Sequence, residues 1–372
     1  MVLAVILQSG NIDKPMNKTV LISGAGFAGL TLAYWLNKFG YKVTLVETSS
    51  GIRKGGSPIE IRGEALNIIA EMGLLEKAKA KRLTVNTTKR MVNAKNETLF
   101  SWNHSEGGDI EIHRDDLLDI LENSVSENVE ILYLNRILEI KPGDETINVT
   151  FKNGETRNFD FVFGADGTHS SVRKMIFGNE ENFSVFFGAY FATCETKEIS
   201  TDEGIIYNEP GKMAGIFPFR NATQAIVVFR SPQLNYDYKN KEQQKQILKT
   251  SFKNSNWKIP QIVDLMLKAD NLYFDEICQI KMPSWSKNRM ALVGDAAYTA
   301  GFPTGMGTTL AIQGAAALAK SLNSSKGDYQ TAFQLYHELF RPFVDRIQAK
   351  IVEGLNFTVP ATQEEIDKRI HQ

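Results

Sequence analysis

The stretch that decides the fold is TVLISGAGFAG, residues 19–29. Its first half is a short β-branched apolar run, typical of a buried parallel strand, and residues 30–38 continue with helical periodicity. The three glycines have separate roles. Gly24 permits a tight turn, Gly26 lets a pyrophosphate approach the backbone, and Gly29 lets the helix pack closely on the strand. This order of strand, glycine turn and helix predicts a dinucleotide-binding βαβ unit.

A second apolar strand is expected at residues 42–46, and it ends in Glu47, 18 residues after Gly29. An acid at this point accepts hydrogen bonds from ribose hydroxyls. The start of the preceding helix, at Phe27 and Ala28, offers free N–H groups and a partial positive charge to the phosphates. By itself, this unit is compatible with either FAD or NAD.

Two further motifs follow the same plan, an apolar strand that ends in small residues and an acid. They are DFVFGADG at residues 160–167, with Arg173 soon after it, and RMALVGDAA at 289–297. Their acids, Asp166 and Asp295, can accept hydrogen bonds from sugar or ribitol hydroxyls. The second motif leads into a glycine-spaced helix start, whose bare N–H groups can hold a flavin ring carbonyl, at Pro303, Gly305, Met306, Gly307 and Thr308.

The three motifs, in this order and at these separations, resemble those of the class A flavoprotein aromatic hydroxylases, the family of para-hydroxybenzoate hydroxylase. The resemblance spans about residues 17–345. It implies an α/β fold with a Rossmann-like, GR2-type FAD-binding domain, an interleaved α+β substrate domain and a C-terminal helix. The expected segments are 16–75, 100–178 and 280–325 for FAD, 76–99 and 179–279 for the substrate-binding sheet, and 326–372 for the C-terminal helical part.

The resemblance also implies roles for single residues. It assigns Gly24, Gly26 and Gly29 to the pyrophosphate, Glu47 to the adenosine ribose, Arg114 to the FAD phosphates or ribitol, Asp166 to FAD and NAD(P)H, Asp295 to the ribitol or pyrophosphate, Gly305 and Gly307 to the isoalloxazine, and Arg53 and Arg62 to flavin or substrate. Because the flavin carries the chemistry, we assign no catalytic side chain. Two positions depart from the family's pattern, which commonly has histidine at Tyr298 and asparagine at Thr308-Thr309.

The segment 183–282 reads as aromatic-rich strands with helices at 241–253 and 260–268. It has no second GxGxxG motif, which favours transient docking of NADPH or NADH near the same flavin. The five histidines show no metal-ligand spacing, so no metal site is expected. The aromatic side chains that are candidates to line a pocket for a flat substrate, although most such residues are core, are Tyr190, Phe217, Phe219, Phe229 and Phe302.

A closer resemblance, to the tetracycline-inactivating flavin monooxygenases, lies at residues 53–63, 294–298 and 339–344. It implies that NAD(P)H reduces FAD, that reduced flavin captures O₂ as a C4a-hydroperoxide, and that one oxygen passes to a polycyclic phenolic or enolic substrate such as a tetracycline. Hydroxylation of small phenols and polyketide tailoring remain alternatives. So do a flavin dehydrogenase that adds no oxygen and a flavoprotein that only sequesters its ligand.

The composition limits the partners. The chain has 42 basic and 43 acidic residues, so nothing in its charge favours nucleic acid or an anionic membrane. Two cysteines build no disulfide framework, and no apolar run is long enough to cross a bilayer. Residues 1–15 lack the basic start of an export signal, and we interpret them as a disordered extension. We therefore expect a cytoplasmic enzyme, monomeric or homodimeric.

Overall fold

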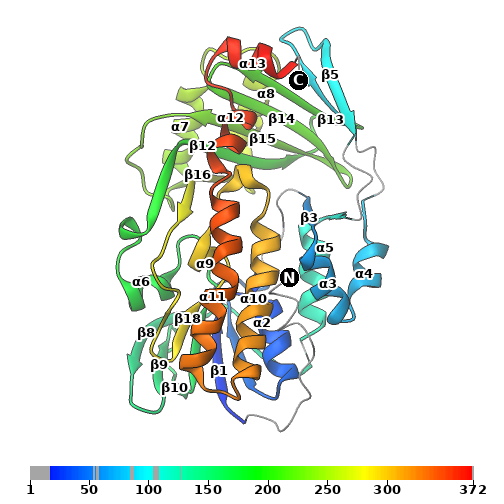
Figure 1. The fold of residues 1–372 in the computed structure, drawn as a ribbon. Helices are drawn as coiled ribbons and strands as arrows, with labels where there is room; N and C mark the ends of the chain where they lie inside the picture. Colours follow the sequence, from blue (N-terminus) through cyan, green and yellow to red (C-terminus); the bar gives the residue numbers. More distant parts are fainter. Residues whose placement is uncertain are drawn as a thin grey trace.

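The computed structural model describes residues 17–52, 55, 58–83, 88–103, 109–125 and 127–370 (Figure 1). Its first half is built on a six-stranded sheet in which β1 lies between β11 and β2, all parallel. The order of the strands is β17 (Ser286–Lys287), β18 (Met290–Leu292), β11 (Phe161–Gly164), β1 (Thr19–Ser23), β2 (Lys42–Val46) and β7 (Glu130–Leu132).

The apolar run of β1 forms the middle of this sheet because both of its faces are covered. Val20, Leu21 and Ile22 have no exposed surface, as a central parallel strand requires. Leu21 lies opposite Val162 of β11 and Thr44 of β2. The predicted α/β dinucleotide-binding fold is confirmed.

Helices and a smaller sheet share the core of this half. α10 (Gly307–Ser324) packs between α2 (Phe27–Lys38) and α11 (Tyr329–Gln348), as Figure 1 shows. The other elements of this half are β8 (Ile137–Pro142), β9 (Ile147–Phe151), β10 (Thr156–Phe159), β3 (Ile59–Ile61), β6 (Ile110–Ile112), α3 (Glu64–Glu71), α4 (Leu75–Ala80), α5 (Arg114–Asn123), α6 (Ser171–Phe177), η1 (Glu180–Asn182), α9 (Asp295–Tyr298) and η2 (Phe302–Thr304).

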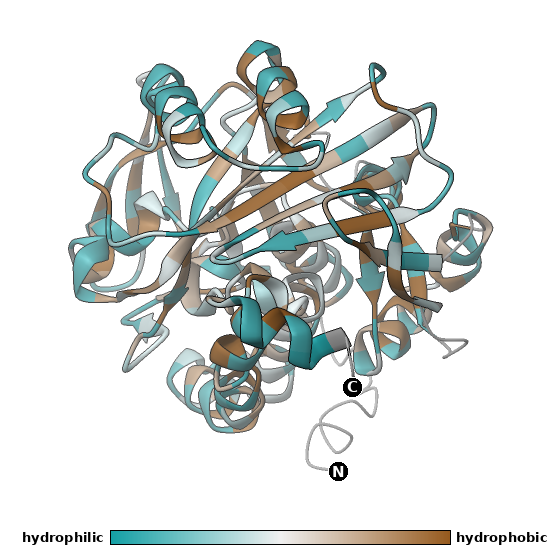
Figure 2. Cartoon of the chain, turned by 90° about the horizontal axis from the view of Figure 1, so that it is seen from above, coloured by the Kyte–Doolittle hydropathy of each residue, from teal (hydrophilic) through white to brown (hydrophobic). Residues whose placement is uncertain are grey.

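The second half is a seven-stranded sheet. Its order is β16 (Tyr273–Ile280), β12 (Ser184–Thr196), β15 (Ala222–Arg230), β14 (Lys212–Phe219), β13 (Gly204–Glu209), β4 (Thr88–Val92) and β5 (Thr98–Asn103). α7 (Lys241–Ser251) and α8 (Ile259–Lys268) contribute to the core on one face of it. Seen from above in Figure 2, hydrophobic stretches run along these strands while the helices carry many hydrophilic residues.

The chain reaches this sheet from distant positions. β4 pairs in parallel with β13, with Lys89 opposite Gly204, although more than a hundred residues separate them in sequence. β5 runs on to Asn103, beyond the end of the segment expected at 76–99. The sheet is therefore assembled by long-range pairing, which leaves no local signature in the sequence.

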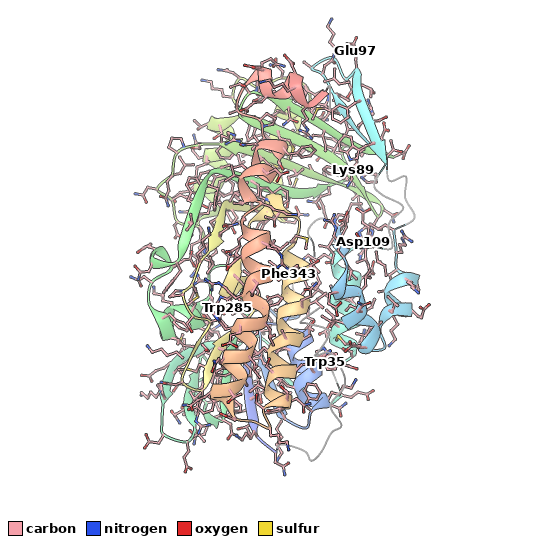
Figure 3. All side chains as sticks on the ribbon, in the orientation of Figure 1. Trp35, Lys89, Glu97, Asp109, Trp285 and Phe343 are labelled. Carbon is pink, nitrogen blue, oxygen red and sulfur yellow. The ribbon has the colours of Figure 1, made fainter. Side chains whose placement is uncertain are left out.

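The C-terminal helices join the two halves. α11 continues through Pro342 without ending. Figure 3 shows Trp285 beside α11. Its ring packs against Tyr336 and Phe340 of that helix, at ring-centroid distances of 5.3 Å and 6.3 Å. Beyond α11, α12 (Ile351–Thr358) buries its apolar side on the sheet, and α13 (Gln363–Ile370) follows.

Within the described ranges, no helix is both long and apolar enough to cross a membrane.

Candidate active site

The three motifs converge at one edge of the six-stranded sheet. Because β1, β11 and β18 are parallel neighbours, their carboxyl ends lie side by side, which is where open α/β sheets bind ligands. The contact is close: a Cβ on Gly24, whose φ is +103°, would lie 2.5 Å from the carbonyl oxygen of Ala165. Only glycine therefore lets the first motif approach the second.

The start of α2 fits a pyrophosphate. A Cβ on Gly29 would lie 1.9 Å from the oxygen of Gly24, whereas none of the described atoms lies within 4 Å of a Cβ on Gly26. The closely packed glycine and the open glycine are those that the sequence assigned to these roles. No side chain of the described residues caps this helix, so its first N–H groups remain available to an anion.

Glu47 is held in place at the end of β2. Its Oε2 accepts a hydrogen bond from the backbone N–H of Ala25 at 2.9 Å, and its Oε1 accepts one from the N–H of Ser49 at 3.0 Å. Burial raises the pKa of this carboxyl, but the hydrogen bonds together outweigh burial and lower it. The ionised carboxylate is fixed beside the glycine turn, where a ribose would lie.

Asp295 combines solvent access with close surroundings. Its side chain is exposed, yet protein encloses it so thoroughly that desolvation raises its pKa to about 6, against the opposing charge of Arg114. Arg114 opens α5, and its guanidinium lies 5.3 Å from the ring centroid of Phe27. The acid, the arginine and the start of α2 thus face a common space.

Asp166 forms hydrogen bonds with the start of α6, the helix that follows it. Its carboxylate accepts hydrogen bonds from Ser170 Oγ at 2.5 Å, Ser171 Oγ at 2.9 Å and the N–H of Val172 at 3.1 Å. In this structure Asp166 therefore caps the start of α6. Its contact with FAD and NAD(P)H stays a prediction.

Arg173 joins the second and third motifs, a role that sequence reasoning missed. This fully buried guanidinium donates to the carbonyl oxygens of Thr168 at 2.6 Å and Ala296 at 3.0 Å, and to Glu180 at 2.6 Å. An arginine shortly after a strand-end Asp-Gly was the available signal, but one of its two partner carbonyls, that of Ala296, lies 123 residues away in the sequence.

The turn between η2 and α10 presents bare backbone. Gly305 and Gly307 are exposed, and no side chain within the described ranges caps α10. Met306 is partly buried against the core. Of the two threonines that depart from the family pattern, Thr308 is partly exposed and Thr309 is buried. The departure therefore leaves the first turn of α10 open to a ring carbonyl.

Tyr298, the other departure, points away from this turn. It is buried and shares a 3.0 Å hydrogen bond with Tyr336 Oη, which also donates to the carbonyl of Leu292. A Cβ on Gly314 of α10 would lie 1.8 Å from Tyr298 Oη. The tyrosine thus fills the space above a helical glycine, between α10 and α11.

The aromatic candidates divide between the two faces of the large sheet. Tyr190 and Phe229 are buried, stacked at 5.5 Å, and belong to the core shared with α7 and α8. Their role is structural, and we no longer count them among the candidate substrate contacts. Phe219 is also buried, with its ring 4.6 Å from His113. Phe217 remains partly exposed on the opposite face.

Phe302 packs against that opposite face by stacking on Phe191, a residue that sequence reasoning missed. Its ring stacks on Phe191 of β12 with centroids 4.8 Å apart and planes at 12°. Phe302 is 39% exposed. Phe191 alternates with the core residues Tyr190 and Ala192, so the period of two could have revealed it once one face was known. The pair forms an aromatic wall between η2 and the sheet.

Polar side chains share this face. Glu195 lies four residues after Phe191 on β12, and Gln224 is its partner on β15. Lys89 of β4 lies next to Phe217, since a Cβ on Gly204 would contact both. Burial raises the pKa of Glu195 and lowers that of Lys89. The wall opposite η2 is therefore aromatic with embedded polar groups, which is typical of a small-molecule pocket.

Arg53 and Arg62 were the two arginine candidates for contact with flavin or substrate. Arg53 lies outside the described residues. Arg62 forms an ion pair with Glu60, lies 3.9 Å from Asp109, and its Nη1 is 4.0 Å from where a Cβ on Gly305 would be. Arg62 therefore borders the exposed turn beside α10. In the part of the chain that the structure describes, no cluster of histidine, cysteine or acidic side chains is placed to hold a metal ion.

Strand-end glycines and two strand-end acids, Glu47 and Asp295, gathered at one sheet edge define a dinucleotide-binding protein. The chain belongs to the family described as FAD binding domain, whose model matches residues 17–346. It is a flavin-dependent monooxygenase with the class A flavoprotein fold and a helical C-terminus.

Individual relatives agree with this assignment. The chain is 36% identical over 365 residues to Uncharacterized protein Rv1260 of Mycobacterium tuberculosis (strain ATCC 25618 / H37Rv), covering 95% of this chain and 98% of the relative. It is 34% identical over 348 residues to a Flavin-dependent monooxygenase of Legionella longbeachae serogroup 1 (strain NSW150), covering 89% and 87%. The crystal structure of tetracycline destructase Tet(55) matches with a TM-score of 0.86 and 33% identity, over 96% of this chain and 95% of that one.

Proposed function

We propose that this monooxygenase uses NADPH or NADH to hydroxylate a flat, polycyclic phenolic or enolic molecule, with a tetracycline as the substrate to test first. The observation that carries the proposal is the aromatic wall of Phe191 and Phe302, which lies beside the exposed turn that begins α10. The match to Tet(55) supports the choice of ring system.

The residues present fit FAD. The N–H groups at Gly26 and Phe27 would bind the pyrophosphate, Glu47 the adenosine ribose, and Asp295 with Arg114 the ribitol side. Bound FAD would accept a hydride from the nicotinamide and would activate O₂. The protein's part is to hold the flavin beside the substrate and to exclude water.

The substrate-facing residues have separable roles. The stacked rings of Phe191 and Phe302 fix a planar substrate by contact with its face. Lys89 offers donors and Glu195 offers acceptors to hydroxyl and carbonyl groups on its edge. Lys89 can also donate to an enolate oxygen, because its ammonium group is a donor only.

The test combines flavin release with isotopic labelling. Denaturation should liberate FAD and not FMN, since FMN lacks the half that Glu47 and the glycine turn would bind. With NADPH, tetracycline and ¹⁸O₂, the product should gain one labelled oxygen and lose the enone absorbance. Oxidation without added oxygen would make the protein a dehydrogenase, and turnover of simple phenols alone would make it a general aromatic hydroxylase.

Variants separate the cofactor from the substrate side. Asp295→Ala should weaken FAD retention, while Asp264→Ala, an exposed acid on α8, should not. Phe191→Leu should raise KM for the substrate and leave FAD binding unchanged, because Phe191 contacts the sheet side of η2. Equal loss of flavin in both aspartate variants would contradict the assigned site.

A further inference from the structure

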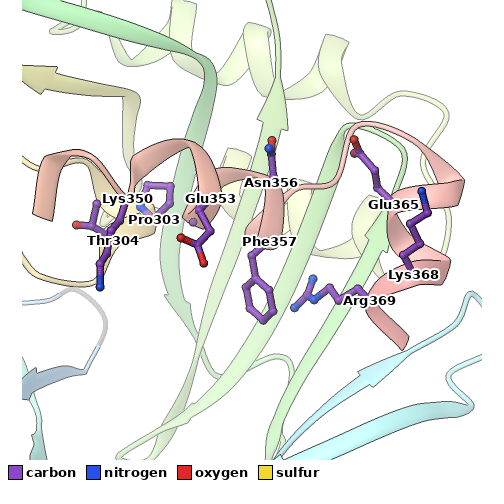
Figure 4. A pocket seen from close by; sticks show the side chains of 10 residues that line it. Pro303, Thr304, Lys350, Glu353, Asn356, Phe357, Glu365, Lys368 and Arg369 are labelled. Carbon is purple, nitrogen blue, oxygen red and sulfur yellow. The ribbon is translucent and has the colours of Figure 1, made fainter. Parts of the chain in front are cut away.

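A groove of about 530 Å³ lies between η2, α12 and α13 (Figure 4). Pro303 and Thr304 line one end of it, next to the turn that leads to α10, and Phe357 and Arg369 line the other. Figure 4 shows the guanidinium of Arg369 and the ring of Phe357 directed toward each other. The groove is distinct from the strand-end motifs and from the aromatic wall.

Arg369 lacks an anionic partner in this groove. No carboxylate of the described residues lies within 4 Å of it, and its buried Nε has no hydrogen-bond partner among them. Nη1 donates to the neutral Oδ1 of Asn208 at 3.0 Å, and the guanidinium carbon lies 3.9 Å from the ring centroid of Phe357. Burial alone lowers the pKa of Arg369, to about 10.

Two acids and two lysines line the groove together with Arg369, namely Glu353, Glu365, Lys350 and Lys368. Glu365, one helical turn before Arg369, accepts a hydrogen bond from the N–H of Ala361 at 2.6 Å. Lys368 pairs with Glu364 at 2.7 Å. Among the described residues, neither Glu364 nor Glu365 of α13 forms an ion pair with Arg369.

Such an arrangement destabilises the free protein. Withdrawing a guanidinium from water is unfavourable unless an anion compensates for it. Phe357 is 57% exposed, which leaves a large aromatic surface beside the charge. An exposed ring next to an unpaired, partly desolvated guanidinium matches a ligand that carries an anionic group on a flat ring system.

We propose that this groove binds a flat organic anion, with its carboxylate, enolate or phosphate on Arg369 and its ring against Phe357. Both an acidic substrate and the phosphate-bearing adenosine of a nicotinamide coenzyme have this chemistry. The inference goes beyond the proposed oxygen transfer, because it concerns binding at a second place on the molecule.

The experiment measures binding to the full-length, FAD-loaded protein by calorimetry, without turnover. The probes are 2-naphthoate, its neutral isostere 2-naphthamide, and adenosine 2′,5′-bisphosphate. Arg369→Gln should weaken binding of at least one anionic probe by about tenfold or more, the usual effect of losing a hydrogen bond to a charged group. Binding of 2-naphthamide should change by less than about threefold.

A matched control is Arg346→Gln. Arg346 is exposed on α11 with its guanidinium 5.7 Å from the ring centroid of Phe343, and it does not line the groove. Anion affinity should be unchanged in this variant. Arg369→Lys, which keeps the charge but not the planar fork, should weaken binding less than Arg369→Gln and guards against a folding defect.

The two anionic probes distinguish the two sources of the anion. Selective loss of 2-naphthoate binding identifies an acidic substrate as the source of the anion, and selective loss of bisphosphate binding identifies the coenzyme. The proposal is overturned if the wild-type protein binds neither anion, if Arg369→Gln leaves both affinities unchanged, or if 2-naphthamide or Arg346→Gln shows the same loss. None of these readings depends on oxygenation, so the proposed function can fail while this site stands.

Discussion

Replacement of Arg173 by methionine tests whether one buried cation joins the second and third flavin motifs. The guanidinium contacts the carbonyl oxygens of Thr168 and Ala296 and the carboxylate of Glu180. Methionine has a similar length but no donor. Arg173→Met therefore leaves two carbonyls and one carboxylate without their partner.

The structure sets the size of the effect. Removing one member of a buried ion pair costs about 3–5 kcal/mol of unfolding free energy. The side chain of Glu180 is 31% exposed, so water partly solvates its carboxylate after Arg173 is removed, and the lower end of this range applies. Each carbonyl that loses its donor adds about 1 kcal/mol, less where water replaces it. We expect a total loss of about 3–5 kcal/mol, together with weaker FAD binding, since the third motif loses its anchor to the second.

Urea unfolding of the apoprotein and fluorescence titration with FAD measure the two quantities. Lys174→Met, an exposed neighbour on α6, is the matched control and should change either by little. A double-mutant cycle with Glu180→Gln should give a coupling energy of at least about 1 kcal/mol. A loss below about 1 kcal/mol in Arg173→Met, with FAD affinity intact, would refute the role of Arg173 as a link.

Three further outcomes are expected. Gly314→Ala places a methyl carbon 1.8 Å from Tyr298 Oη and should lower stability by about 1–3 kcal/mol, with partial recovery on adding Tyr298→Phe, as thermal unfolding would show. The pKa of His169 is raised to about 10, because hydrogen bonds to Asp275 and Glu180 outweigh its burial. The stability that protonated His169 contributes is therefore full below pH 6.5 and is lost as the pH rises toward 10. The difference in unfolding free energy between wild type and His169→Gln should narrow over that range in urea titrations at different pH values. Desolvation raises the pKa of Asp295 to about 6, so its ionisation opposes folding above that pH. The Asp295→Asn apoprotein should therefore be more stable than wild type at pH 8, and this advantage should disappear near pH 4. A pH-independent difference would contradict either assignment.

The flavin half of the site was predictable because each of its functions is local. Gly24, Gly26 and Gly29 act through backbone geometry within one turn, and Glu47 and Asp295 stand at the ends of their own strands. Residues that are contiguous in sequence carry the glycine spacing, the strand and the acid together. The order of the three motifs then brings them to one sheet edge, because parallel neighbours end on the same side.

The substrate half was not predictable in the same way. An alternating strand shows that two faces differ, but the sequence does not say which face meets the flavin. Tyr190 and Phe191 are adjacent aromatics on β12, yet one is core beneath α7 and α8 and the other stacks on Phe302. Only the packing of η2 against the sheet distinguishes them.

The sequence by itself therefore determined the cofactor class, and it supplied the positions that we assign to FAD. Tertiary structure alone decided which aromatic side chains lie on the face toward η2, that Arg173 joins two motifs, and that Arg369 has no acidic partner among the described residues. The physical reason is the range of the interactions. Turns, caps and strand ends form within a few residues, whereas the exposure and partners of a side chain depend on chain segments that only folding brings together.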